Sequence, residues 1–150
     1  MSSVCRKLEK VIQYYSTNLS APTVSFREAL LKGLAPDGGL YMPASLPKFS
    51  FKELEALSGM TYPELASDIL GKIIGNEISK RDLTEICNDI YTFSIPLENI
   101  YNRTWLLRLD QGPTASFKDF AALLMGRLMQ HFLNIENKRI TILTATSGDT

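Results

Sequence analysis

The pattern of apolar and polar positions divides the chain into two parts, which meet near residue 100. In the first part, two stretches carry apolar side chains three or four positions apart, the spacing that places them on one face of a helix. We expect helices from about residue 63 to 74 and from about 80 to 93. Their core-facing stripes are Leu65, Ile69, Leu70 and Ile73 in the first, and Leu83, Ile86, Cys87 and Ile90 in the second.

Shorter elements precede these two helices. The runs IQYYST (12–17) and LYMP (40–43) predict extended segments, SFREALLKGL (25–34) predicts a helix, and a further helix is expected after Ser50. Several helix starts have the capping-box spacing, in which a hydroxyl and a carboxylate satisfy unpaired backbone N–H groups. The pairs are Ser25 with Glu28 and Ser50 with Glu53, and more loosely Thr61 with Glu64 and Ser79 with Asp82. The segment APDGG (35–39) predicts a tight turn, for which we favour a structural role over a ligand contact.

From residue 104 onward the pattern predicts strand, helix, strand. TWLLRLD (104–110) is rich in β-forming residues, and a helix is expected from about 117 to 133. RITILTA (139–145) is a nearly continuous apolar run, typical of a strand buried on both faces of a parallel sheet. In such a βαβ unit the helix start and the end of the second strand lie at the same sheet edge, where open α/β sheets bind ligands. Lys118 should therefore lie beside the loop at 146–150.

Composition narrows the classes of function. Sixteen Lys plus Arg balance sixteen Asp plus Glu, which leaves no basic face for nucleic acid. No stretch approaches the roughly 20 apolar residues of a membrane span, and the first twelve residues lack the apolar core of a signal peptide. Cys5 and Cys87 are far apart and have no metal-ligand spacing. We expect a cytoplasmic protein with free thiols, no metal site, and neither nucleic-acid nor membrane partners.

Lys118 and the last loop carry the candidate chemistry. Ser116 and Asp119 have the spacing of a helix N-cap and its third helical residue, which places Lys118 at the positive end of the helix dipole. A cation is disfavoured there, and a neutral, nucleophilic amine is favoured. The loop TSGDT (146–150) offers hydroxyl groups, a glycine and successive N–H donors for a carboxylate or phosphate. Each motif alone is equally compatible with a solvated lysine or an ordinary turn, so the indication comes from their combination.

The two motifs together resemble those of a known enzyme family. GPTASFKDF (112–120) followed by ATSGDT (145–150) is similar to the threonine synthases, which depend on pyridoxal 5'-phosphate (PLP) and have the tryptophan-synthase-β-like fold. YYST (14–17) and VSFREALLKGLAPDGGLYMP (24–43) resemble that family's N-terminal domain, so the resemblance runs from about residue 13 to 150. It implies an α/β protein in which a small α+β domain over 1–100, with 1–12 as a leader, precedes a fold type II three-layer βαβ domain. That second domain starts at 101 and is truncated at 150.

The resemblance also implies roles for individual residues. Lys118 becomes the catalytic lysine that binds PLP covalently. Ser147, Gly148 and Asp149 are assigned to the cofactor, and Thr146, Ser147 and Thr150 to the substrate. Asp149 stands where many relatives with other reactions have Asn, which supports a threonine synthase. A carboxylate beside the cofactor's phenolate oxygen would repel it, so either the pair shares a proton or Asp149 points elsewhere.

The implied reaction converts O-phospho-L-homoserine and water to L-threonine and phosphate by γ-elimination and β-addition. The family's phosphate-binding loop and its partner for the pyridine nitrogen fall beyond position 150, so the 150 residues alone are expected to be inactive. Two alternatives stay open. The first is a related phospho-lyase that releases 2-oxobutyrate, and the second is a non-catalytic folding or interaction module.

The remaining aromatic and imidazole groups are expected to have structural roles. Trp105, Phe117, Phe120 and Phe132 occupy positions that suit packing in the core, and Phe117 is the one of the four that could line a pocket. His131 lies several helical turns from Lys118, so we expect a solvent-facing position or an interaction with the helix C-terminus rather than a catalytic role.

Overall fold

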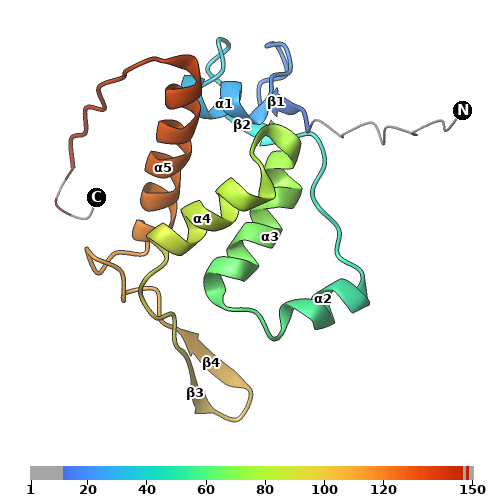
Figure 1. The fold of residues 1–150 in the computed structure, drawn as a ribbon, viewed down its shortest axis with the longest axis vertical. Helices are drawn as coiled ribbons and strands as arrows, with labels where there is room; N and C mark the ends of the chain where they lie inside the picture. Colours follow the sequence, from blue (N-terminus) through green and yellow to red (C-terminus); the bar gives the residue numbers. More distant parts are fainter. Residues whose placement is uncertain (1–11, 147, 149–150) are drawn as a thin grey trace, which may run out of the picture. The chain divides into compact units, whose positions relative to one another are not determined.

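The computed structural model describes residues 12–146 and 148. Figure 1 labels its elements, which are β1 (Tyr14–Ser16), α1 (Phe26–Lys32), β2 (Tyr41–Pro43), α2 (Phe51–Leu57), α3 (Tyr62–Ile74), the 3₁₀ turn η1 (Gly75–Glu77), α4 (Lys80–Ile90), β3 (Leu97–Tyr101), β4 (Thr104–Leu107) and α5 (Asp119–Glu136). The described residues form two compact units, one from 12–61 and 65–83, the other from 62–64 and 84 onward. The division into domains at residue 100 stays a prediction.

The first unit is built on the antiparallel pair β1–β2, which confirms the two predicted extended segments. Tyr14 is opposite Pro43 in this pair and also bridges to Val24. Its ring is buried in a core cluster with Val24 and Ala29, and its hydroxyl donates to the carbonyl of Ile73 at 2.7 Å. Burial, and to a smaller extent the charge of Glu77, raises the pKa of Tyr14 to about 12. Tyr14 therefore anchors β1 to the end of α3.

The turn over 35–39 is a structural one, as predicted. The Asp37 carboxylate accepts from the hydroxyl of the fully buried Ser16 at 2.6 Å and from the backbone N–H groups of Ser20 and Gly39, each at 3.0 Å. These bonds, led by that from Ser16, lower the pKa of Asp37. A Cβ on Gly39 would lie 2.1 Å from Ser16 Oγ and 2.9 Å from the backbone nitrogen of Asn18. Only glycine fits at this contact.

The predicted helix starts are largely confirmed. Ser50 and Glu53 form a full capping box, and the hydroxyl of Ser25 accepts from the N–H of Glu28 at 3.2 Å. Glu28 does not complete its box, because its carboxylate instead pairs with Lys32, one turn further along the same helix, at 2.7 Å. The missing carboxylate comes from Glu77, which accepts from the N–H groups of Phe26 and Arg27 at 2.7 and 3.1 Å. A side chain about fifty residues away thus caps α1.

The two predicted helical stripes differ in burial. In α4 the predicted residues Leu83, Ile86, Cys87 and Ile90 are all buried, as expected. In α3 the residues of the predicted stripe are only partly buried. The buried residues of this helix are Ser67 and Ile74, which are not part of that stripe. The helix is confirmed, but the face with the most complete burial is rotated from the one that hydrophobicity alone selects.

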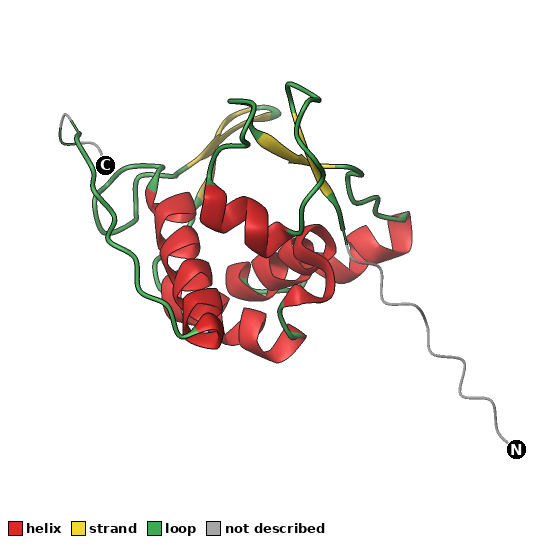
Figure 2. Ribbon diagram, turned by 90° about the horizontal axis from the view of Figure 1, so that it is seen from above, coloured by secondary structure: helices red, strands yellow, loops and turns green. Residues whose placement is uncertain are grey.

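In the second unit β4 pairs with β3 as an antiparallel hairpin. The strand at 104–107 was expected, whereas β3 was not. The turn is formed by Asn102 and Arg103, with Asn102 in the left-handed region at φ 47°. Every residue of both strands is exposed, so the prediction of a core position for Trp105, which is 55% exposed, is wrong. Figure 2 shows this ribbon and β1–β2 as the strands of the fold.

The predicted strand at 139–145 is not present among the described residues, which have no regular structure there and are exposed. A strand needs a neighbouring strand to pair its backbone N–H and C=O groups, and β4 pairs only with β3 here. The βαβ unit is therefore wrong for this structure, and the three-layer domain stays a prediction. The coarser α/β class is confirmed.

The helix predicted from 117 to 133 is α5, shifted toward the C-terminus. It ends at Glu136 and is capped by Asn137, which adopts the left-handed conformation at φ 50°. The next N–H, that of Lys138, donates back to the carbonyl of Leu133 at 2.9 Å, the 6→1 bond of a Schellman C-cap. Leu128 and Phe132 are buried on its inner face, the latter as predicted. No helix within 12–146 and 148 combines the length and apolar character needed to cross a bilayer.

Candidate active site

Lys118 lies directly before the first residue of α5, so its predicted position at a helix N-terminus is confirmed. Its backbone is already helical, and its N–H donates to the hydroxyl of Ser116 at 3.2 Å. The carbonyl of Lys118 accepts from Ala122, which is the first i→i+4 bond of the helix. The side chain therefore leaves the backbone where the helix dipole is positive.

The Asp119 N–H donates to the carbonyl of Ser116 at 3.1 Å, but its carboxylate does not serve the predicted cap. One oxygen of its carboxylate accepts from the N–H of Thr114 at 2.9 Å, and the other accepts from the Thr114 hydroxyl at 2.7 Å. Asp119 is only 6% exposed, and Gly112 lies against it, because a Cβ on Gly112 would be 2.3 Å from Oδ2. Ala115 turns the loop between them in the left-handed region, at φ 57°.

An open pocket of about 610 Å³ lies beside this loop. Its lining comes from two segments far apart in sequence, and consists of Leu109, Asp110, Thr114, Ala115, Ser116, Phe117 and Gly148. Gly148 is therefore brought to the loop that precedes α5, although 139–145 is not a strand. Its N–H donates to the hydroxyl of Thr146 at 2.9 Å. Phe117 lines the pocket, but it is 66% exposed, so its predicted core position is wrong.

The structure gives less information on the other predicted site residues. Lys118 follows Phe117 directly but is not among the residues that line this pocket. Ser147, Asp149 and Thr150, predicted for cofactor and substrate binding, lie outside the described residues. Their assignments stay predictions, as do the roles given to Lys118, Thr146 and Gly148.

Sequence reasoning did not identify Asp110 as a pocket residue. Arg108 donates to both of its carboxylate oxygens at 2.8 and 2.7 Å and reaches Glu98 on β3 at 3.0 Å. The Arg108 guanidinium, through its hydrogen bonds above all, holds the pKa of Asp110 well below the usual range. The alternation of charge in Leu-Arg-Leu-Asp was the available signal, since it places Arg108 and Asp110 on one side of an extended segment.

An aromatic cluster supports the first turn of α5. Tyr62, Tyr91, Phe93 and Phe120 form it, with ring centroids between 4.9 and 6.4 Å apart. The Tyr91 hydroxyl donates to the carbonyl of Phe120 at 3.1 Å, two residues after Lys118. Burial raises the pKa of Tyr91, so this hydroxyl stays a donor across the neutral range. The predicted packing role of Phe120 is consistent with these contacts.

Two other groups singled out by sequence lie elsewhere. His131 is half-buried, with its ring edge-on to Phe132 at 5.4 Å, and belongs to the packing of α5. Cys87 is a buried free thiol, while Cys5 is outside the described residues. Within 12–146 and 148, no three His, Cys, Asp or Glu side chains converge in a way that could hold a metal ion.

Comparison with known proteins gives consistent matches. Residues 13–91 match the family described as Threonine synthase N terminus. The chain is 40% identical over 144 residues to the threonine synthase of Pseudomonas aeruginosa, covering 93% of this chain and 31% of that protein. It is 36% identical over 143 residues to a Threonine synthase-like 2 protein of Pongo abelii, covering 91% and 30%.

A similar solved structure is the crystal structure of PLP-bound threonine synthase from Brucella melitensis. It superimposes with a TM-score of 0.82 at 38% identity, over 85% of this chain and 29% of that one. The chain therefore spans about a third of the length of the relatives that it matches.

Proposed function

Because the chain belongs to the threonine synthase family, we propose that the protein is a PLP-dependent lyase that converts O-phospho-L-homoserine and water to L-threonine and phosphate. The observation that carries the proposal is the extent of the match to a threonine synthase. The alignment covers 93% of the chain, so the similarity extends well beyond the region 13–91 that the family model matches.

The residues present fit the cofactor. Lys118, which carries a primary amine, directly follows Phe117, an exposed aromatic residue that lines the pocket together with the hydroxyl-bearing Thr114 and Ser116. These are groups suited to an aldehyde, to polar ring substituents and to an aromatic ring face. When bound, PLP supplies an electron sink for carbanions formed at the substrate.

The chain's own residues then have distinct tasks. Nζ of Lys118 would hold the cofactor at its carbonyl carbon, and the same amine would take and return protons at the substrate carbons. Ser147, Gly148 and Asp149 orient the cofactor, and the hydroxyls and N–H groups of Thr146, Ser147 and Thr150 hold the substrate carboxylate. Asp149 must share a proton with its neighbouring oxygen or turn from it, because two adjacent negative charges repel.

A phospho-lyase that releases 2-oxobutyrate from a related phosphorylated substrate is the second candidate. The similarity to a Threonine synthase-like 2 protein favours keeping it, since both candidates would use the residues described above. We further propose that the two domains meet near residue 100, that the second has the three-layer fold, and that the protein is cytoplasmic and acts on small molecules rather than on nucleic acid.

Product analysis of the full-length protein tests the proposal. Incubation with PLP and O-phospho-L-homoserine should release phosphate and threonine in equal amounts. Phosphate with 2-oxobutyrate in place of threonine would support the second candidate. If neither product is released and no PLP is bound covalently, the result would support the alternative of a non-catalytic folding or interaction module.

A further inference from the structure

We infer that Asp119 is a positioning residue, whose carboxylate fixes the loop from Gly112 to Lys118 and so sets how the Lys118 amine is presented. This inference rests on the function proposed above, because it concerns the same lysine. It is distinct from a helix-capping role, since the carboxylate faces back into the loop rather than serving the first turn of α5.

The two bonds to Thr114 close the loop on itself. The carboxylate oxygens accept separately, Oδ2 from the backbone N–H at 2.9 Å and Oδ1 from the hydroxyl at 2.7 Å. Two bonds to one residue fix its orientation as well as its distance. Thr114 is exposed, so its two hydrogen bonds to Asp119 are the contacts that attach this part of the loop to the helix.

The start of the loop is held by shape. A Cβ on Gly112 would lie 2.3 Å from Oδ2 of Asp119, 2.8 Å from its Cβ and 2.9 Å from its Cγ. The backbone of Gly112 is therefore packed closely against the Oδ2 side of Asp119. The carbonyl of Gly112 also accepts from the N–H of Ala115 at 3.0 Å, so a backbone bond and the packing against Asp119 both hold the start of the loop.

The burial of Asp119 explains why this arrangement should persist. A carboxylate that is 6% exposed has a large desolvation cost unless donors reach it. Thr114 supplies two donors, and the positive end of α5 favours a negative charge at its first residue. A loop that moved away from Asp119 would lose both bonds from Thr114 at once. The observed conformation, which keeps Lys118 close in the chain to the pocket residues Thr114, Ser116 and Phe117, is therefore favoured.

Variants of Asp119 in the full-length protein separate geometry from charge. Asp119→Asn keeps both bonds, because its amide oxygen accepts from the Thr114 N–H and its amino group donates to the Thr114 hydroxyl oxygen. Asp119→Ala removes both, and Thr114→Val removes only the hydroxyl bond. Asp89→Ala is the matched control, since Asp89 is an exposed carboxylate on α4 that pairs with Arg127.

Amide exchange of residues 112–118 in the PLP-free protein is the first measurement, followed by the Kd for PLP and the fraction of PLP that borohydride fixes to Lys118. Asp119→Ala should speed exchange in this loop and weaken PLP binding by about tenfold or more, whereas Asp119→Asn should stay within about threefold of the parent and Asp89→Ala should match it. Thr114→Val should fall between, and it keeps the test decisive if Asp119→Ala fails to fold.

Two results would overturn the inference. One is normal loop exchange in Asp119→Ala or, where that variant does not fold, in Thr114→Val. The other is equal damage in Asp119→Ala and Asp119→Asn, which would assign the effect to charge rather than position. If the parent protein binds no PLP at Lys118, the proposed function fails instead, and the exchange comparison still decides whether Asp119 orders the loop.

Discussion

At the scale of the residue, Cys87 shows how enclosure changes chemistry. Its side chain has no exposed surface, and burial raises the pKa of the thiol from 9.0 to about 11. The neutral thiol is neither a good nucleophile nor a metal ligand. Between pH 9 and 11 the unfolded thiol ionises while the folded one does not, so the free energy of unfolding should fall as pH rises through that window.

Alkylation tests this enclosure in a Cys5→Ser background, where Cys87 is the remaining cysteine. At pH 8 a difference of two pKa units leaves about one hundredth of the thiolate found in the unfolded chain. Iodoacetamide should therefore label Cys87 at least about 100-fold more slowly in the native protein than in denaturant. Native labelling at the denatured rate would mean that the site opens readily.

The lysine assignment is tested by Lys118→Ala in the full-length protein. The visible absorbance of covalently bound PLP should disappear, while the circular dichroism spectrum stays that of the parent, because Lys118 is only half-buried. Lys138→Ala is the control, since Lys138 forms an exposed pair with Glu136 beyond the other end of α5. Fixation of PLP to any lysine other than Lys118 after borohydride reduction would contradict the assignment.

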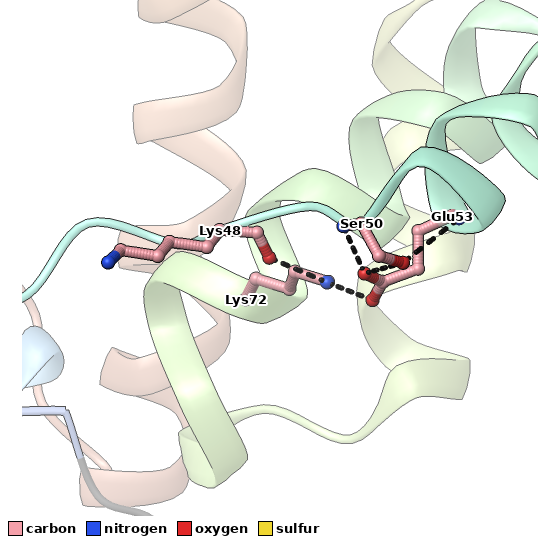
Figure 3. A network of polar contacts seen from close by, with 4 residues as sticks. All are labelled: Lys48, Ser50, Glu53 and Lys72. Carbon is pink, nitrogen blue, oxygen red and sulfur yellow. Dashed lines mark hydrogen bonds and ion pairs between the residues drawn. The ribbon is translucent and has the colours of Figure 1, made fainter.

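At the scale of the element, α2 depends on polar contacts. It has no buried residue, and seven residues are too few for a helix to be stable alone. Figure 3 shows how it is held, with Lys72 of α3 donating to Glu53 at 2.5 Å and to the carbonyl of Lys48 at 3.4 Å. The same ammonium lies 4.2 Å from the centre of the Phe49 ring. Hydrogen bonds from Lys72, then from Ser50, lower the pKa of Glu53 to about 2.

This contact predicts a pH-dependent α2. A carboxyl with a depressed pKa stabilises the fold above its unfolded value of 4.5, and that contribution is lost as pH falls toward 2. Amide exchange of residues 51–57, referenced to α3, should therefore accelerate beyond its intrinsic pH dependence below about pH 4.5. Glu53→Gln should show fast exchange already at pH 6, with little further change.

Glu55→Gln, an exposed carboxyl on the same helix, is the matched control and should behave as the parent. If Glu53→Gln exchanges as slowly as the parent at pH 6, the charge of Glu53 does not hold α2 in place.

Local signals made several elements predictable. The 3.6-residue period of α4, the Ser50–Glu53 box and the position of Lys118 before α5 depend on residues within one or two turns of one another. The strand at 139–145 could not be settled in this way, because an apolar run becomes a strand only when another strand pairs with it. β3 was not predicted, because both faces of Leu97–Tyr101 are exposed. A strand of this kind does not need the alternation of apolar and polar residues by which a half-buried strand is recognised in a sequence.

The residues of the candidate site could be predicted from the sequence, but the hydrogen bonds between them could not. Ser116 and Thr114 lie three and five positions before Asp119, and both carry a hydroxyl. Which one the carboxylate binds depends on the left-handed turn at Ala115, a conformation that alanine rarely adopts and that composition does not indicate.

At the scale of the molecule, the hairpin carries an unusual amount of exposed apolar surface. Leu97, Ile100, Tyr101, Trp105, Leu106 and Leu107 are each at least 46% exposed. Surfaces of this kind on a protein normally mark a contact with another part of a fold or with a partner. The relatives are about three times longer than this chain, so we expect further parts of a protein of that length to cover the hairpin.

Trp105, the single tryptophan of the 150 residues, reports on that covering. In the 150-residue chain its emission should be close to that of a solvated indole and easily quenched by acrylamide. In the full-length protein the same residue should emit at shorter wavelength and resist quenching. Subtracting the spectrum of the Trp105→Phe variant of each protein isolates its signal, and equal quenching in both would show that the hairpin stays uncovered.

The tight contact at Gly39 also has a consequence for the gene. Every amino acid other than glycine brings a Cβ, and one of the atoms in its way is a backbone nitrogen, which no change of rotamer can move aside. The other, Ser16 Oγ, is committed to Asp37. Every missense change at this position should therefore destabilise the fold. In a library of random variants selected for a folded product, we expect the Gly39 codon to show only synonymous changes.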